Sequence, residues 1–175
     1  MDFEILAGAL RDNGYAIGAL FRSVELEQMR WKPAEDRWSL LEVLNHLLDE
    51  ERNDFRQIIR KLIEDPKIDW PNNSPMEWVT SRNYNGRDPI ESLHLFERER
   101  AESVEWLEKT DEPDYDTKYA GSNAPPAPLR IGDIMSSWIA HDYFHLRQST
   151  NLKWEYLMRP ENRYTCWYAG EYQPP

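Results

Sequence analysis

The stretch WSLLEVLNHLLDE, residues 38–50, decides the fold prediction because it contains a complete helix start. Ser39 can cap a helix, and Glu42 stands three residues later, which is the spacing of a capping box. Trp38 and Val43 occupy the two positions whose side chains pack together around such a cap. The stretch therefore predicts a helix that begins directly after Ser39.

An apolar stripe extends this predicted helix from Leu40 to about Ile63. Its residues recur at three- and four-residue steps, as on one face of an α-helix. They are Leu40, Val43, Leu44, Leu47, Phe55, Ile58, Ile59 and Leu62. The pair Asp65-Pro66 ends the helix, since the residue before a proline disfavours the helical conformation.

The same periodicity predicts three further helices, over residues 3–29, 89–110 and 131–158. Asp88 caps the second of these, and Pro89 takes the first turn, where its missing N–H has no cost. No segment shows the alternation of a strand, so the predicted fold class is all-α.

Two long connections, residues 66–87 and 111–130, join these helices and are rich in Pro, Gly and Asn. Connections of this length allow crossovers, so we predict a four-helix bundle that departs from strict up-and-down order. The length of 175 residues suits a single domain, residues 1–175, with an aromatic tail from about residue 160. We expect Tyr164, Trp167 and Tyr168 in that tail to pack back on the body.

Composition narrows the partners of the protein. Its 21 basic and 32 acidic residues give a net charge of −11, which argues against general binding to nucleic acid or to anionic membranes. Cys166 is the single cysteine, so no intrachain disulfide is possible and a reducing compartment is expected. The first residues lack the basic start of a signal peptide, and no run approaches the ~20 apolar residues of a membrane span. We expect a soluble, cytoplasmic protein.

Two of the four histidines stand four residues apart in HDYFHLRQ, residues 141–148. His141 and His145 share a helix face, although such a pair is often a surface accident. His46 lies on or beside the apolar stripe of the helix that follows Ser39. Buried imidazoles need a partner, and a shared cation would satisfy all three. His94 has no partner spacing and is not expected to be a ligand.

The set of motifs RWSLLEVLNHLLDEE, SRNYNGRDP and HDYFHLRQ resembles the DinB-like superfamily, which includes YfiT-like proteins regarded as metal-dependent hydrolases. The resemblance covers most of the chain before residue 160. It implies an up-down-down-up four-helix bundle, often dimeric, so a homodimer is expected. It also implies that His46, His141 and His145 hold one divalent transition metal, such as Zn, Ni or Fe.

Three histidine ligands leave positions open for water or substrate. The leading hypothesis is a metal-dependent hydrolase of an unknown small molecule. Glu50, one turn after His46, is the candidate general base, with Asp49 behind it, although the interpretation of both as solvated charges in the run DEER is the favoured one. Asp142 and Gln148 are candidates to orient the histidines.

Two alternative functions remain open at this point. A thiol-dependent S-transferase or isomerase would use the metal to stabilise a thiolate and would need cations for the acidic groups of a low-molecular-weight thiol. Arg37, Arg82, Arg87 and Arg147 are the candidates for that role. A non-catalytic metal-binding module of a stress response would bind metal without turnover, with a fourth protein ligand closing the site.

Overall fold

The computed structural model describes residues 2–69, 74–121 and 129–170, and confirms the all-α prediction. The long helices are α1 (Phe3–Phe21), α3 (Leu40–Asn53), α4 (Phe55–Glu64), α6 (Pro89–Lys109) and α7 (Ile131–Leu157). The short ones are α2 (Leu26–Arg30), α5 (Pro75–Ser81), and the 3-10 turns η1 (Tyr84–Gly86) and η2 (Trp167–Ala169). Within the described residues there is no strand, apart from one isolated antiparallel bridge between Lys118 and Arg130. No described helix combines the length and the apolar character needed to cross a bilayer.

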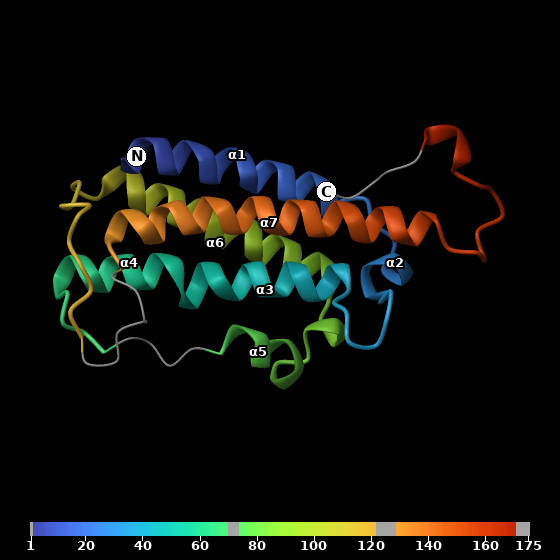
Figure 1. The fold of residues 1–175 in the computed structure, drawn as a ribbon, viewed down its shortest axis with the longest axis horizontal. Coiled ribbons are helices and arrows are strands. Elements are labelled where there is room, and N and C mark those ends of the chain that lie inside the picture. The colour runs from blue at the N-terminus through green and yellow to red at the C-terminus, as the bar shows by residue number, and fades with distance from the viewer. Residues whose placement is uncertain (1, 70–73, 122–128, 171–175) are drawn as a thin grey trace.

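The helices form a four-helix bundle of up-down-down-up order, as predicted (Figure 1). α1 and α7 run in one direction, whereas α3 with α4, and α6, run in the other. α1 packs on α6 and α7, α3 packs on α6, and α4 packs on α7. The first crossover returns along the bundle, and its α5 and η1 contact α3. The crossover therefore contains a short helix and covers one side of α3.

The predicted helix starts are confirmed by their hydrogen bonds. Ser39 Oγ accepts from Glu42 N at 3.1 Å, and Glu42 Oε2 accepts from Ser39 N at 2.8 Å, which completes the capping box. Asp88 Oδ1 accepts from Glu91 N at 2.8 Å at the start of α6. These local contacts satisfy backbone donors that a helix start otherwise leaves without partners.

The helix predicted over residues 3–29 is in fact two helices. α1 ends at Phe21, and α2 begins at Leu26 after a turn. This turn lets Met29 pack in the same apolar cluster as Phe21 and Leu40. A continuous helix would carry Met29 onward in the direction of α1, away from that cluster, so burial of its side chain favours the break.

The helix predicted from Leu40 to Ile63 is interrupted at Asp54, where the backbone leaves helical geometry (φ −122°, ψ −102°). Hydrogen bonding continues across the interruption, since Asp54 N donates to Glu50 O and Asp54 O accepts from Ile58 N. The offset places the Phe55 ring against Trp138 of α7, with ring centroids 5.7 Å apart. Packing against a distant helix therefore decides where α3 ends and α4 begins.

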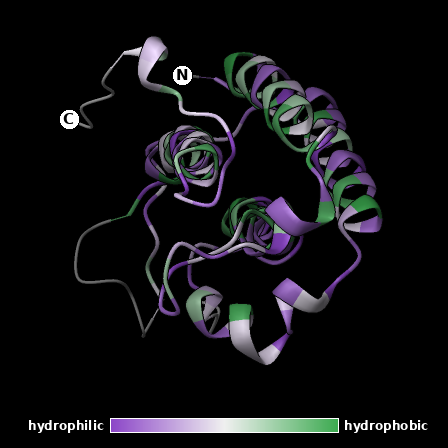
Figure 2. Cartoon of the chain, turned by 90° about the vertical axis from the view of Figure 1, so that its right-hand side faces the viewer, coloured by the Kyte–Doolittle hydropathy of each residue, from purple (hydrophilic) through white to green (hydrophobic). Residues whose placement is uncertain are grey.

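The interior consists of two apolar clusters with a polar layer between them. The helices carry both hydrophilic and hydrophobic residues, as their mixed colours show (Figure 2). One cluster includes Leu6, Leu10, Ile59, Leu107, Met135 and Trp138. The other includes Ile17, Leu41, Leu44, Leu48, Phe96 and Leu152. The polar layer comprises four buried residues, one from each of α1, α3, α6 and α7: Asn13, Glu51, Arg100 and Asp142.

The expected packing of the tail is wrong for the residues that the structure describes. Tyr164, Trp167 and Tyr168 are 74%, 77% and 90% exposed, and the segment extends away from the end of α7 (Figure 1). The last part of the predicted tail, residues 171–175, lies outside the described residues. Aromatic content alone predicted burial, but no described element of the bundle offers these rings a surface.

Candidate metal centre

Three histidines from two helices meet at one point between α3 and α7. His46 Nε2 lies 3.1 Å from His141 Nε2, and His145 Nε2 lies 3.1 Å from the same atom. One nitrogen from each ring falls within a group whose members are all within 4.8 Å of one another. The structure thus brings together the three residues predicted as ligands, which stand 95 and four positions apart along the chain.

All three imidazoles are held in the neutral form. Burial, together with the nearby His145 and His141, lowers the pKa of His46 to about 2. Burial and the Arg100 guanidinium lower the pKa of His141 to about 4, and burial and His141 lower that of His145 to about 3. Neutral imidazole is the form that binds a metal ion.

Gln148 determines which nitrogen of His145 carries the proton. His145 Nδ1 lies 2.7 Å from Gln148 Oε1, an oxygen that can only accept a hydrogen bond. Nδ1 therefore holds the ring proton, and Nε2 presents a lone pair toward the other two histidines. A hydrogen bond of this kind, on the ring nitrogen that faces away from the metal, typically orients a metal-binding histidine, and it agrees with the predicted orienting role of Gln148.

The donor set fits a metal ion better than it fits internal hydrogen bonds. A proton on His141 Nε2 could serve one neighbouring lone pair but not two. His46 Nδ1 is also buried without a hydrogen-bond partner among the described residues. Two nitrogens that bind one ion at about 2.0–2.1 Å lie at most ~4.2 Å apart. The two 3.1 Å separations satisfy this limit, and all three nitrogens lie within 4.8 Å of one another, so a small shift of the rings would suffice for a shared ion. A shared cation would use all three lone pairs at once.

Glu50 lies beside the centre, and the interpretation of Glu50 and Asp49 as solvated charges is wrong. Their exposed fractions are 5% and 3%. Glu50 Oε1 lies 3.9 Å from His46 Nδ1, and neither atom has a hydrogen-bond partner within the described part of the chain. Burial and a hydrogen bond with Asp54 raise the pKa of Glu50 to about 9. Asp49 instead accepts from Tyr84 Oη at 2.5 Å.

Aromatic rings surround the three imidazoles. The Trp38 ring lies 5.0 Å from the His46 ring and parallel to that of His145 at 6.3 Å, measured between centroids. Phe55 packs against His141 at 5.3 Å, and Phe144 meets His145 edge-on at 4.9 Å. Each histidine therefore has an aromatic neighbour, and these rings limit the access of water to the centre.

The histidines line a cavity of about 640 Å³, which is within the size range of small-molecule sites. Its apolar lining residues are Trp38, Phe55, Pro75, Met76 and Phe144. Its charged lining residues are Asp36, Arg37, Glu50 and Asp54. The site can therefore admit a small molecule with substantial apolar surface next to the three nitrogens.

The remaining predicted residues lie away from the centre or engage other groups. Asp142 is fully buried and pairs with Arg100, so it belongs to the polar layer rather than to the histidines. Arg82 donates to Asp49 at 2.7 Å. His94 is exposed on α6, in line with the expectation that it is not a ligand.

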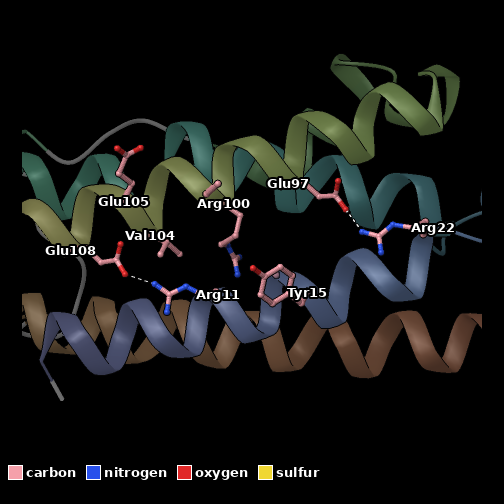
Figure 3. A pocket seen from close by; sticks show the side chains of 10 residues that line it. Arg11, Tyr15, Arg22, Glu97, Arg100, Val104, Glu105 and Glu108 are labelled. Carbon is pink, nitrogen blue, oxygen red and sulfur yellow. Dashed lines mark hydrogen bonds and ion pairs between the residues drawn. The ribbon is translucent and has the colours of Figure 1, made fainter.

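A second cavity of about 430 Å³ lies between α1 and α6, and none of the three histidines lines it (Figure 3). Arg22 pairs with Glu97 at 2.6 Å across it, and Arg11 pairs with Glu108. Arg100 points from α6 toward α1 in the same view. The charges across this groove are paired, so it offers a ligand fewer unsatisfied groups than the histidine cavity does.

Comparison with known sequences places the chain in a family. A sequence profile of the DinB superfamily matches residues 9–149, which include all three histidines and Gln148. The chain belongs to the DinB superfamily. The match covers the four-helix bundle from α1 to most of α7 and leaves the aromatic tail outside it.

A DinB-like protein of known structure has the same fold. YfiT from Bacillus subtilis, described as a probable metal-dependent hydrolase with an unusual four-helix bundle topology, superposes with a TM-score of 0.73. The alignment covers 88% of this chain and 87% of YfiT, at 14% sequence identity. At that identity the likeness establishes the fold alone. No curated protein sequence matches this chain.

Several residues of this DinB-like site were absent from the sequence prediction. Phe55, Phe144 and Asp54 line the cavity, whereas the sequence pattern assigns Phe55 to the apolar stripe and predicts no role for Phe144 or Asp54. One signal was available for Phe144, because it stands between the two histidines of the HDYFH motif. No local signal identifies Asp54, since its position follows from the interruption between α3 and α4.

Proposed function

We propose that this protein is a metal-dependent hydrolase of a small molecule, with one divalent transition metal, such as Zn, Ni or Fe, held by His46, His141 and His145. The observation that carries the proposal is the convergence of three neutral imidazoles at the wall of an aromatic-lined cavity. Within the described residues no fourth side chain joins this group, so coordination positions stay available to substrate and water.

A divalent ion in such a site supplies Lewis acidity, which activates water for attack and polarises a carbonyl or phosphoryl group. The residues of the chain supply the remaining functions. Gln148 fixes the orientation of His145 through its 2.7 Å hydrogen bond. Trp38, Phe55 and Phe144 pack against the histidine rings and limit the access of bulk water to them.

Glu50 is the residue proposed to move a proton. Its carboxyl group lines the cavity, is buried, and has one oxygen without a hydrogen-bond partner among the described residues. Because its pKa is raised to about 9, the Glu50 carboxyl group holds a proton near neutral pH, so we assign it the donation of that proton to a leaving group rather than the role of general base. The same side chain can hold the N–H of His46, whose Nδ1 lies 3.9 Å away. Both roles place Glu50 next to the reacting groups, so Glu50→Gln should lower turnover while leaving the three nitrogens in place.

The proposal is tested first by metal content. Protein purified without a histidine tag should contain close to one divalent metal per chain, and His46→Ala should lose it. His94→Ala removes an exposed histidine outside the site and should retain it. Equal metal content in the parent protein and His46→Ala would contradict the assignment.

The second test is turnover. Metal-loaded protein is assayed against panels of esters, amides and phosphoesters, with His141→Ala and His94→Ala in parallel. Hydrolysis that disappears in His141→Ala and persists in His94→Ala supports the proposal. Metal binding without any turnover would favour the non-catalytic module instead.

A further inference from the structure

The charges that line the histidine cavity are unevenly distributed. Arg37 is the single Lys or Arg among the described lining residues, and its two terminal nitrogens lie 2.9 and 3.0 Å from the carboxylate oxygens of Glu155. Three acids, Asp36, Glu50 and Asp54, line the same cavity. The one guanidinium is therefore already neutralised by a bidentate pair, whereas carboxyl groups face the space a ligand would occupy.

Other arginines do not compensate for this deficit. Arg82 donates to Asp49 and Arg87 donates to Asn45, at 2.7 and 3.0 Å. Neither they nor Arg147 are among the residues that line the cavity. A low-molecular-weight thiol with several carboxylates would find no uncommitted lining cation within the described part of the chain.

Asp36 is the acid best placed to meet a ligand. It is exposed, it lines the cavity, and no described Lys or Arg lies within ion-pair distance of its carboxylate. The walls beside it include Trp38, Phe144 and Met76, and the last two are 51% and 69% exposed. Aromatic faces next to a carboxylate form a favourable environment for an ammonium group, through ion pairing and cation–π attraction.

We propose that the cavity selects a substrate with an apolar or aromatic body that is uncharged or carries an amine, and that it disfavours any anionic group other than one bound at the histidines. This inference rests on the proposed function, since it concerns the substrate of the same site. A carboxylate on the ligand body would lose hydration near the Asp36 carboxylate without a free lining cation to replace that hydration. An ammonium group at the same position would instead form an ion pair with the Asp36 carboxylate.

Three probes that share one metal-binding head group test this preference without turnover. They are benzohydroxamate and its derivatives with a para-aminomethyl or a para-carboxylate group. Binding is followed through the absorption spectrum of the cobalt-loaded protein. The aminomethyl probe should bind at least as tightly as benzohydroxamate, and the carboxylate probe about tenfold more weakly or worse, as expected for a difference of ~1.4 kcal/mol.

Two variants locate the cause of the preference. Asp36→Asn should weaken binding of the aminomethyl probe about threefold or more and leave the affinity for benzohydroxamate unchanged. Glu155→Gln removes the partner of Arg37 and should strengthen the carboxylate probe. Glu35→Gln, which changes the neighbouring exposed acid outside the lining, is the matched control and should leave all three affinities as they are.

The outcomes separate this inference from the proposed function. If cobalt binds and the carboxylate probe binds as tightly as the aminomethyl probe, the charge preference is wrong while the metal site stands. Bound cobalt with no response to any of the three probes overturns the apolar-body assignment in the same way. Protein that takes up no cobalt overturns both the metal site and the inference that rests on it.

Discussion

The histidine centre and the polar layer use neighbouring residues of the same two helices, α3 and α7. The hydrogen-bonding groups of the polar layer are paired within the chain, whereas several of those at the histidine centre are not. The histidine centre includes His141 and stands beside Glu50, whereas the polar layer includes Asp142 and Glu51. Because successive residues of a helix point about 100° apart, each pair sends one side chain to the centre and the other to the layer. The sequence thus places a fully paired polar network, the polar layer, next to a partly paired one, the histidine centre.

The polar layer supplies its own opposite charges. Arg100 donates to both oxygens of Asp142, at 2.7 and 2.8 Å, and pairs with Glu51 at 2.6 Å. Glu51 also accepts from Trp138 Nε1 at 2.9 Å, and Asn13 donates to Asp142 at 3.2 Å. Every charged group in this layer has a partner, as buried ions require.

The histidine centre lacks such partners. Its three imidazole nitrogens cannot all be satisfied by one another, since one proton on His141 Nε2 serves a single neighbour. In addition, His46 Nδ1 and Glu50 Oε1 have no hydrogen-bond partner among the described residues. Buried polar atoms that find no partner within the described chain, next to a network that is fully paired, are better explained by a ligand-binding role than by poor packing. The comparison therefore separates a structural role from a functional one.

The largest effect should come from breaking the complete network. Arg100→Met leaves two carboxylates buried without a counter-charge and should lower the free energy of unfolding by about 3–5 kcal/mol. Urea unfolding followed by circular dichroism measures it. Arg22→Met, which breaks an exposed pair with Glu97, should cost less than about 1 kcal/mol. Similar costs for the two variants would remove the distinction drawn here.

The incomplete network should instead respond to metal. A divalent ion at one hundred times its dissociation constant should raise the free energy of unfolding by about 2.7 kcal/mol. Unfolding is measured with zinc and with a chelator, for the parent protein, His46→Ala and His94→Ala. The gain should vanish in His46→Ala and persist in His94→Ala. A gain that persists in His46→Ala would place the ion elsewhere.

The hydrogen bond from His145 to Gln148 gives a smaller and more specific effect. Gln148→Met removes the acceptor and should weaken metal affinity about tenfold, as is common for contacts that orient a metal ligand. Gln148→Glu keeps an acceptor oxygen and should retain most of the affinity. Competition with a metal indicator dye measures both variants. Equal weakening in the two would indicate a loss of packing rather than of the hydrogen bond.

Features that depend on local sequence were predictable. The caps at Ser39 and Asp88 are hydrogen bonds made within three residues, and the apolar stripes follow helix geometry. The convergence of His46 with His141 could also be predicted from the sequence, because each histidine stands beside the buried face of its helix. Resemblance to the DinB-like superfamily added the order of the helices, which spacing alone does not determine.

Features that depend on distant partners were not predictable from one sequence. Glu51 stands in the run DEER and has the appearance of a solvated charge, yet its partner Arg100 lies 49 residues away in α6. The interruption at Asp54 depends on the packing of Phe55 against Trp138. In both cases tertiary contact outweighs local propensity, and no spacing within a helix records it.

The pH dependence of stability offers the smallest but most direct test of the open centre. In the metal-free folded protein the pKa of His46 is lowered to about 2, against 6.5 in the unfolded chain. As the pH falls below 6.5, only the unfolded state therefore binds a proton on this ring. Each such histidine should therefore lower stability by about 1 kcal/mol between pH 6.5 and 5.5. Glu50 acts in the opposite sense. Its raised pKa, about 9, keeps a proton on the folded state, whereas the unfolded state loses this proton above pH 4.5. The contribution of Glu50 to the free energy of unfolding therefore falls as the pH rises from 4.5 to 9.

These opposing contributions can be separated by substitution. His46→Gln should reduce the stability loss between pH 6.5 and 5.5 by about 1 kcal/mol, and Glu50→Gln should reduce the loss on the alkaline side, as measured by urea unfolding in the presence of a chelator. His94→Gln controls for the removal of a histidine as such. If His46→Gln follows the parent protein across this range, the ring is charged or solvated in the folded state. The contrast between the open centre and the closed polar layer would then no longer hold.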